Sequence, residues 1–160
     1  MKSFIWNKNY VTGIQDVDEQ HHQLIDIINR LGQLIIDNDV PVEQVKRVVD
    51  ELVVYATYHF KDEEHMMATK GIDSRHLTSH VVAHRHFLSE VDSLSSHISN
   101  DSSQSAKQLF EFLIHWLSYH ILGSDQDMAR QLECIESGLT PQEAYDKEER
   151  EKNQSTGPFL

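Results

Sequence analysis

The chain has 160 residues, of which 39% are hydrophobic and 25% are charged, and this fits one domain with an apolar core of ordinary size. Its formal net charge of −12 argues against nucleic acid and anionic membrane surfaces as partners, because both attract clusters of Lys and Arg. The sequence also shows no secretory signal, no apolar run long enough to cross a bilayer and a single cysteine, Cys134, which excludes an internal disulfide and leads us to expect a cytoplasmic protein.

The residue pattern predicts an all-α protein. β-branched runs are short, no Asn-Gly or Asp-Gly hairpin signal occurs, and the few glycines and prolines stand at breaks between helical stretches. We therefore expect an antiparallel up-down-up-down four-helix bundle with an N-terminal extended arm and a short C-terminal helix. In chain order the expected elements are an arm at 1–15, long helices at 16–37, 41–70, 74–99 and 105–122, a short helix at 126–136 and a charged tail at 137–160.

Residues that cap or break helices mark several of these boundaries. The expected ones are Asp39 and Pro41 at the start of the second long helix, Gly71 at its end, Asp73 or Ser74 at the start of the third, a polar loop at 100–105, and Gly123 at the end of the fourth. After the short helix, Thr140 and Glu143 form a capping-box pattern ahead of a segment that is almost entirely charged. We therefore take residues 1–136 as the bundle domain and residues 137–160 as a charged helical linker or tail.

Each long helix carries one stripe of core residues at alternating spacings of three and four, which is the rhythm of a bundle helix. The stripes are Val17, His21, Leu24, Ile28, Leu31 and Ile35; Val45, Val49, Leu52, Ala56, His59, Glu63 and Met66; Leu77, His80, His84, Phe87, Val91, Leu94 and Ile98; and Ala106, Leu109, Leu113, Trp116 and His120. Every stripe includes a histidine, and the second includes a glutamate. These polar side chains are therefore predicted to face the core.

Five inward histidines and one inward glutamate predict a metal centre. One buried histidine is usually satisfied by an ordinary hydrogen bond, but a buried carboxylate without a partner is costly, and the rest of each stripe is largely apolar. A metal centre satisfies all of these groups together. They also share one level of an up-down bundle, since they lie near the starts of the first and third helices and the ends of the second and fourth. The remaining histidines lie off the stripes and are predicted to face solvent: His22, His65, His76, His86, His97 and His115.

Asp125 is a further candidate ligand, because it follows His120 by five residues and a bend at the glycine between them could turn it toward the metal. Five imidazoles and two carboxylates exceed the four ligands of a tetrahedral zinc and suit two iron ions. Bridging by Glu63, Asp125 and one oxo or hydroxo group leaves one position vacant on one iron, where O₂ can bind. Ferritin-like oxidases use Glu-x-x-His instead, and the only such pair here, Glu19 and His22, lies off the stripe.

Four motifs, in this order, resemble those of the bacterial members of the hemerythrin family. Residues 18–24 resemble the D-x-Q-H-x-x-L signature, residues 59–64 resemble H-F-x-x-E-E, residues 80–87 resemble H-x-x-x-H-x-x-F, and residues 116–125 resemble W-L-x-x-H-x-x-x-x-D. The arm with Trp6, Tyr10, Gly13 and Ile14 also resembles the start of the family. The resemblance covers residues 4–130 and implies an up-down helical bundle of the myohemerythrin type.

The resemblance implies a role for each candidate ligand. It assigns His80, His84 and His120 to a six-coordinate iron, His21 and His59 to the iron with the vacant position, and Glu63 and Asp125 to the two bridges. The implied cofactors are two iron ions, Fe²⁺ or Fe³⁺, with a bridging oxo or hydroxo group, and the implied partner is O₂. Pairing His76 with His80 is an alternative, but it breaks the stripe at Ala83. The stripe and the signature both favour His21 over His22.

Three functions are compatible with O₂ binding. We expect an oxygen or redox sensor module of a bacterial signalling protein, because the charged segment 139–153 looks like a linker to a C-terminal output domain and the last six residues fit a chain cut at a boundary. The alternative is a stand-alone O₂ carrier, store or scavenger whose tail is a solvated helix. A di-iron oxidase is less favoured, and we expect no enzyme, because no stripe offers a spare acid, base or thiol and Cys134 lies beyond the bundle.

Overall fold

The computed structural model describes residues 3–36, 41–99 and 103–155, and these residues are largely helical. The α-helices are α1 (Gln15–Leu34), α2 (Val42–Lys70), α3 (Ser74–Ser95), α4 (Gln104–His120), α5 (Gln126–Glu136) and α6 (Pro141–Ser155). A short 3₁₀ helix, η1 (Lys8–Tyr10), precedes α1, and a π-helical turn, η2 (Ile121–Asp125), joins α4 to α5. The prediction of an all-α fold is confirmed.

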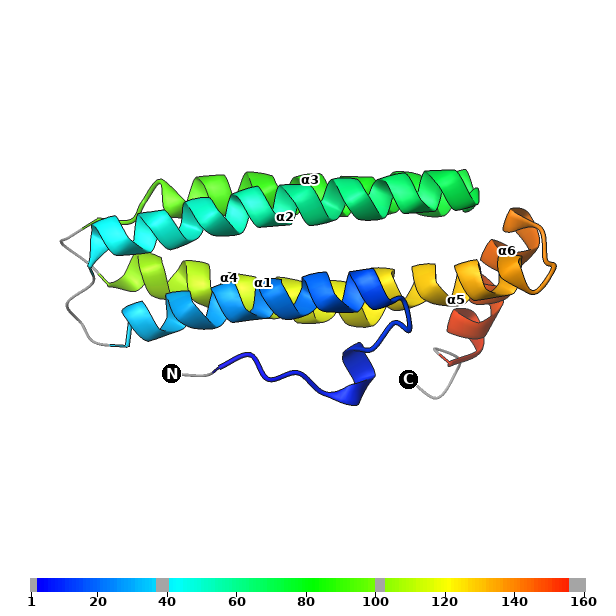
Figure 1. The fold of residues 1–160 in the computed structure, drawn as a ribbon, viewed down its shortest axis with the longest axis horizontal. Helices are drawn as coiled ribbons and strands as arrows, with labels where there is room; N and C mark the ends of the chain where they lie inside the picture. Colours follow the sequence, from blue (N-terminus) through cyan, green and yellow to red (C-terminus); the bar gives the residue numbers. More distant parts are fainter. Residues whose placement is uncertain (1–2, 37–40, 100–102, 156–160) are drawn as a thin grey trace.

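The four longest helices form a bundle, with their axes side by side (Figure 1). Each helix packs on the next one along the chain, and α4 also contacts α1, so that the four enclose a common interior. The sequence colouring reverses its direction from each of these helices to the next (Figure 1). None of the described helices combines the length and the apolar character needed to cross a lipid bilayer.

The N-terminal arm is extended apart from the turn of η1, and it is tied to the bundle at both ends. The backbone N–H of Phe4 donates to Asn29 Oδ1 at 2.8 Å, and the hydroxyl of Tyr10 lies 2.9 Å from Ser118 Oγ. Phe4 and Tyr10 are themselves buried, so the arm contributes to the core.

Two apolar clusters fill the interior, and a polar layer separates them. The larger cluster occupies most of the bundle, and the smaller one lies toward α5 and consists of Val17, Met67, Ile72, Met128 and Leu132. In α1, His21 lies between Val17 of the smaller cluster and Leu24 of the larger one. In α2, which the sequence colouring of Figure 1 shows running the other way, Glu63 lies between Phe60 of the larger cluster and Met67 of the smaller one. The polar stripe residues therefore form one layer across the bundle, as their positions along the helices predict.

Most stripe residues are buried as predicted, but a few are only half-buried: Met66, Leu77, Leu94 and Trp116. In α2 the predicted Met66 is replaced in the core by Met67, which is fully buried. A straight helix turns by about 20° per heptad relative to a strict seven-residue repeat, so the inward face drifts along a helix as long as α2.

Several helix boundaries differ from the predicted ones. Helix α1 ends at Leu34 rather than 37, and α3 ends at Ser95 rather than 99. The hydroxyls of Ser95 and Ser96 donate to backbone carbonyls three residues earlier, and such bonds compete with helix continuation. Pro41 is the N-cap of α2 instead of lying inside it.

Other boundaries are confirmed. Gly71 adopts the left-handed conformation at φ 75° after α2, and the Asp73 side chain caps α3 by accepting from the N–H of Arg75. The predicted cap Asp39 and residues 100–102 of the predicted loop lie outside the described residues.

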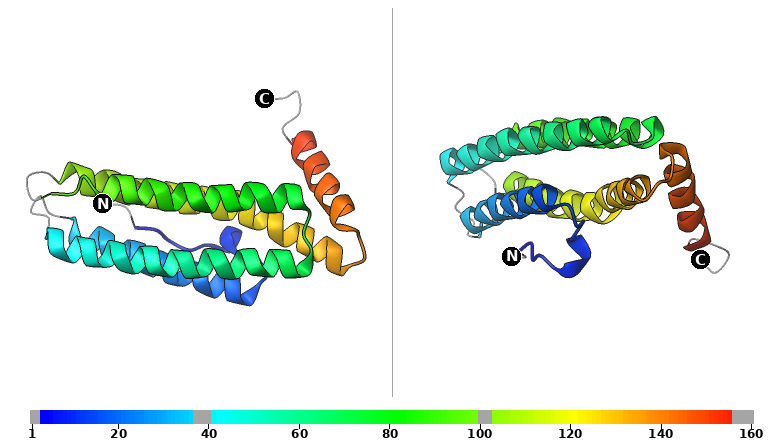
Figure 2. Two further views of the ribbon diagram at one scale, coloured as in Figure 1. Left: turned by 90° about the horizontal axis from the view of Figure 1, so that it is seen from above. Right: turned by 45° about the vertical axis from the view of Figure 1, so that its right-hand side comes forward.

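Residues 141–155 of the charged tail form helix α6, which packs on α5. Its capping box is confirmed, since the N–H of Thr140 donates to Glu143 Oε1 at 3.0 Å and the N–H of Glu143 donates to Thr140 Oγ1 at 3.1 Å. Helix α6 contacts α5 and buries Ala144 and Glu148. Figure 2 shows it at one end of the bundle, at a steep angle to the long helices.

Candidate metal centre

The polar layer brings all the predicted ligand residues into one buried cluster. Its members are His21 of α1, His59 and Glu63 of α2, His80 and His84 of α3, His120 of α4 and Asp125 at the end of η2. None of these side chains is more than 5% exposed. The cluster is therefore closed to bulk water while every one of its members carries a nitrogen or oxygen capable of binding a metal.

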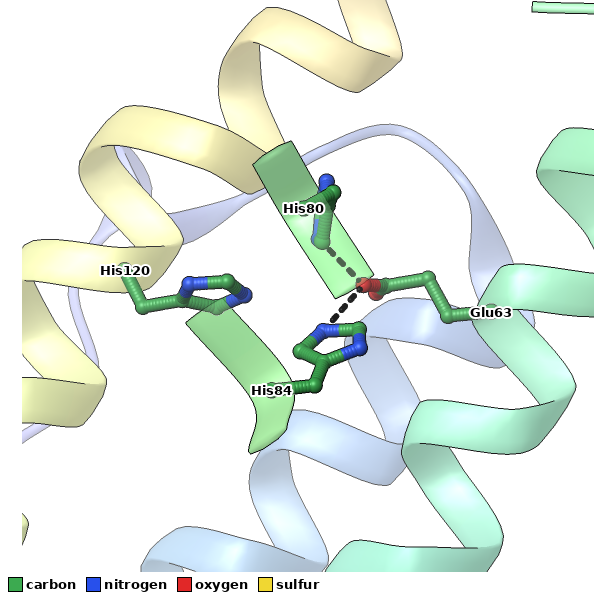
Figure 3. A group of neighbouring side chains, drawn as sticks. All are labelled: Glu63, His80, His84 and His120. Carbon is green, nitrogen blue, oxygen red and sulfur yellow. Dashed lines mark ion pairs between the residues drawn. The ribbon is translucent and has the colours of Figure 1, made fainter. Parts of the chain in front are cut away.

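Glu63 lies between two groups of imidazoles. Its Oε1 is 2.7 Å from Nε2 of His80 and 3.2 Å from Nε2 of His84, and its Oε2 is 3.5 Å from Nε2 of His59. Figure 3 shows the carboxylate pointing at the imidazoles of His80 and His84, with His120 completing the group. One oxygen therefore serves each side of the cluster.

Asp125 divides its oxygens in the same way. Its Oδ1 is 3.1 Å from Nε2 of His80 and 3.4 Å from Nε2 of His120, whereas its Oδ2 is 3.0 Å from Nε2 of His21. Two groups of ligand atoms result, each within 4.8 Å: Glu63 with His80, His84 and His120, and Glu63 with His21 and His59. Asp125 contacts imidazoles of both groups, so it joins them as Glu63 does.

The π-helical turn η2 places Asp125 in the cluster. Five residues of an α-helix rotate a side chain by about 140° from its starting direction, which would turn Asp125 away from His120. A π-helical turn closes after five residues instead, so both side chains lie on one face. The predicted helix end and bend at Gly123 are therefore wrong: the chain stays helical through η2 into α5, and the π turn brings Asp125 inward.

The nitrogen and oxygen atoms in this cluster lack ordinary hydrogen-bond partners. Among the described residues, both oxygens of Glu63 and of Asp125 have none of good geometry, and neither has Nε2 of His21, His80, His84 or His120. Each carboxylate oxygen lies within 3.5 Å of at least one imidazole nitrogen, but these atoms point toward the centre of the cluster and do not form separate donor–acceptor pairs. Buried polar atoms of a native protein are rarely left in this state, and a bound cation accounts for all of them at once. The residues present therefore fit a metal centre.

Both carboxylates are ionised in spite of their burial. Burial and the charge of Asp125 act to raise the pKa of Glu63, but the imidazoles facing it, His59 first, outweigh them and lower this pKa to about 2. Burial likewise acts to raise the pKa of Asp125, and His120 and His21 bring it well below its ordinary value. The cluster thus holds two negative charges in a dry interior, which favours a cation there.

The imidazoles respond unequally to these charges. Burial acts to lower the pKa of His80, but the carboxylates of Asp125 and Glu63 raise it to about 10. His59 lies farther from Glu63, and burial lowers its pKa to about 4. Without a cation, a proton on His80 balances part of the carboxylate charge.

Hydrogen bonds outside the cluster orient two of the imidazoles. The Gln20 amide donates to Asp62 Oδ2 at 2.8 Å, so its oxygen faces His59 Nδ1 at 2.6 Å and accepts a hydrogen bond from the N–H there. His84 Nδ1 lies 2.7 Å from Glu64 Oε2 and donates to that carboxylate. In both rings the lone pair therefore remains on Nε2, which faces the cluster.

Aromatic rings fix two imidazole planes. Phe60 stacks on His84 with ring centres 3.9 Å apart and an interplanar angle of 9°. Trp116 stacks on His120 with ring centres 4.4 Å apart and an angle of 12°. The aromatic residues of the H-F and W-L-x-x-H motifs thus hold the imidazoles in place, although Trp116 is only half-buried.

One histidine is misassigned by the sequence pattern. His76 is predicted to face solvent, but it is 6% exposed and its Nε2 lies 2.9 Å from Nδ1 of His80. The spacing of four residues to His80 is the signal that places both on one helix face. The other off-stripe histidines are exposed as predicted: His22, His65, His86, His97 and His115.

Comparison with known proteins agrees with this geometry. A bacteriohemerythrin of Clostridium acetobutylicum is 29% identical over 128 residues, which are 78% of this chain and 97% of the relative. A bacteriohemerythrin of Stenotrophomonas maltophilia is 29% identical over 84% of each chain. A hemerythrin-like protein of Naegleria gruberi is 30% identical over 76% of this chain and 87% of its own. Residues 12–132 match the family model of the hemerythrin HHE cation binding domain, and the chain therefore belongs to the hemerythrin family.

Proposed function

We propose that this domain binds O₂ at a pair of non-haem iron ions held in the polar layer. One ion takes His80, His84 and His120, the other takes His21 and His59, and Glu63 and Asp125 bridge them together with an oxo or hydroxo group. The observation that carries this proposal is that each carboxylate directs one oxygen to each group of imidazoles. Two separate groups of imidazoles, each facing one oxygen of each carboxylate, suit two cations bridged by the carboxylates better than one cation.

The iron pair, when reduced, supplies the electrons for reversible O₂ binding. The protein supplies five neutral nitrogen ligands and two carboxylates, which leave one ion short of six ligands when one further bridge is present. His59 and His84 keep their protons on Nδ1, toward Gln20 and Glu64, so that Nε2 is free to bind. The apolar clusters on either side exclude water from the layer.

The scaffold in this proposal is an antiparallel up-down-up-down four-helix bundle formed by residues 1–136, with residues 137–160 as a tail. In such a bundle the start of α1, the end of α2, the start of α3 and the end of α4 lie at one level. This arrangement explains how ligands far apart in the sequence meet in one layer.

Carriage, storage or scavenging of O₂ is the role that we propose first. The matched region makes up 97% of the Clostridium relative and 84% of the Stenotrophomonas relative, so these relatives are little longer than the domain itself. This favours a function that the domain performs alone over the sensor module expected from the charged tail.

Oxygen or redox sensing is a second candidate, which the contacts of α6 favour. Arg130 of α5 binds Glu148 of α6 through two nitrogens, at 2.9 and 2.7 Å, and Lys152 lies 2.5 Å from Asp127. Helix α5 follows Asp125 directly, so movement of that bridging carboxylate would reach α6 through these ion pairs.

Iron analysis of the reduced protein before and after exposure to air tests the proposal. Two irons per chain and visible charge-transfer bands after exposure to O₂ are the expected result, and the His120→Ala variant should lose iron. His115→Ala is the matched control, since His115 is exposed on the same helix. A metal-free protein, or unchanged iron in His120→Ala, would contradict the ligand set.

The two roles differ in the fate of the O₂ complex. Carriage requires a stable O₂ complex that releases O₂ under vacuum. Sensing requires rapid conversion to the di-ferric form together with a change in hydrogen exchange of the α6 amides. An α6 that exchanges identically in both oxidation states would eliminate the sensing role.

A further inference from the structure

A buried pair of side chains outside the ligand set extends from His80 to helix α5. His76 is 6% exposed and Gln131 is 2% exposed. His76 Nε2 lies 2.9 Å from His80 Nδ1, and His76 Nδ1 lies 3.1 Å from Gln131 Nε2. Gln131 Oε1 has no hydrogen-bond partner among the described residues. Burying two polar side chains beside the smaller apolar cluster is costly, so the pair calls for a reason beyond packing.

Once His80 has lost the extra proton that it holds without a cation, both rings are neutral, and proton counting along these contacts allows two arrangements. A neutral imidazole carries one N–H, so each ring must accept on one nitrogen and donate from the other. If the Gln131 NH₂ group donates to His76 Nδ1, then His76 donates from Nε2 to His80. The proton of His80 then lies on Nε2, inside the polar layer, where it blocks the lone pair.

The reverse arrangement frees that lone pair. If Gln131 Oε1 accepts from His76 Nδ1, then His76 Nε2 accepts from His80 Nδ1, and Nε2 of His80 faces Glu63 and Asp125 without a proton. The oxygen and nitrogen of an amide have the same shape, so half a turn about the last bond of Gln131 exchanges them. Each arrangement leaves one amide atom unpartnered, so the hydrogen-bond count does not choose between them.

We infer that His76 and Gln131 are positioning residues that hold His80 in the Nδ1–H form, with the Gln131 amide half a turn from its placement in the structure so that its oxygen faces His76. This inference rests on the proposed function, because only a bound cation requires the lone pair on Nε2. His59 and His84 donate to an amide and a carboxylate directly, whereas His80 depends on a second imidazole. Helix α5 thus reaches the same centre twice, through Gln131 and through Asp125 just before its start.

Two substitutions at Gln131 distinguish the arrangements. Gln131→Met removes the hydrogen bond at similar volume, and Gln131→Glu keeps only acceptors. The measurement is Fe²⁺ affinity by competition with a chelator under anaerobic conditions. We expect Gln131→Met to bind Fe²⁺ about 10- to 100-fold more weakly, as is usual when the partner of a metal-binding histidine is removed. Gln131→Glu should bind within a few-fold of wild type, because a carboxylate accepts from His76 Nδ1.

A parallel pair at His76 and a spectroscopic readout complete the experiment. His76→Phe should weaken Fe²⁺ binding like Gln131→Met, and His76→Gln should restore part of it, since an amide oxygen can accept from His80. His86→Phe, exposed on the same helix, is the matched control. In Zn²⁺-loaded wild-type protein, ¹⁵N NMR of the imidazoles should find the protons of His76 and His80 on Nδ1.

Each outcome decides the inference. Unchanged Fe²⁺ affinity in His76→Phe, equal weakening in Gln131→Glu and Gln131→Met, or a proton on Nε2 of His76 in the Zn²⁺-loaded protein would overturn it while leaving the proposed function intact. Wild-type protein that binds no iron would reject the proposed function and this inference with it. If His76→Phe fails to give the wild-type circular dichroism spectrum without metal, the Gln131 pair and the NMR measurement decide alone.

Discussion

Replacing His120 by leucine should stabilise the metal-free protein while weakening iron binding. His120 is buried, its Nε2 has no hydrogen-bond partner among the described residues, and burial lowers its pKa so that the ring is neutral. An unsatisfied buried polar atom costs about 1–3 kcal/mol. Leucine removes that cost but also removes the stack on Trp116, which contributes about 0.5–1.5 kcal/mol. Asp125 keeps His21 and His80 as neighbours in the variant.

The difference between the midpoints of these two ranges is a net gain in the free energy of unfolding of about 1 kcal/mol, or a rise in Tm of about 2–4 °C for a chain of this size. The assay is thermal and urea unfolding followed by circular dichroism in the presence of a chelator, with iron content measured separately. His115→Leu, on the exposed face of the same helix, should change stability by no more than about 0.5 kcal/mol. A metal-free His120→Leu protein less stable than wild type would show that the nitrogen of His120 is satisfied without metal, and the reasoning from unpartnered atoms would fail.

Three further substitutions test the packing around the site. Gly32→Ala should destabilise the fold by about 1–2 kcal/mol in urea unfolding, because its Cβ would lie 2.6 Å from Cζ of the buried Phe110 and overpacking outweighs the better helix propensity of Ala. Thr140→Ala should lose about 1 kcal/mol of local stability in α6, seen as faster amide exchange there, since it removes one half of the capping box. Glu148→Gln should speed limited proteolysis of α6 without lowering iron content, because it removes the charge that Arg130 binds.

Matched controls accompany these substitutions. Gly123→Ala should not destabilise the protein, because the added Cβ meets nothing within 4 Å beyond the neighbouring backbone of its own helix. Glu151→Gln, exposed on α6, should leave proteolysis unchanged. A Gly32→Ala variant as stable as Gly123→Ala would mean that Phe110 moves aside freely. Loss of iron in Glu148→Gln would mean that α6 supports the metal site directly.

The sequence predicts the buried polar layer well because one rule places apolar and polar residues on the inward face. Apolar residues at spacings of three and four define an inward face, and His21, His59 and Glu63 fall on it for the same reason that their apolar neighbours do. Their shared level reflects where they stand along their helices. The pattern succeeds wherever a helix is regular and packs only inside the bundle.

The pattern misplaces residues where a helix is long, where α5 adds contacts from outside the four helices, or where a π turn interrupts the α-helix. Met67 replaces Met66 because the inward face drifts along a long helix. His76 is buried because Gln131 of α5 covers a face that four helices alone would leave open. Asp125 is correctly selected as a neighbour of the cluster, but the means is a π turn, and spacing alone does not distinguish this from a bend at Gly123. Contacts from α5 join residues far apart in the sequence, so the spacing of residues within one helix does not predict them.

The polar layer also bears on how this protein unfolds. It separates the hydrophobic interior into two unequal parts, which are the larger and the smaller apolar cluster. Without metal the smaller part, which includes Met67 and Met128, can open as a separate cooperative unit while the larger part stays folded. Iron that bonds to four helices at once would couple the two parts into one all-or-none transition, so that metal loading changes the cooperativity of unfolding as well as its midpoint.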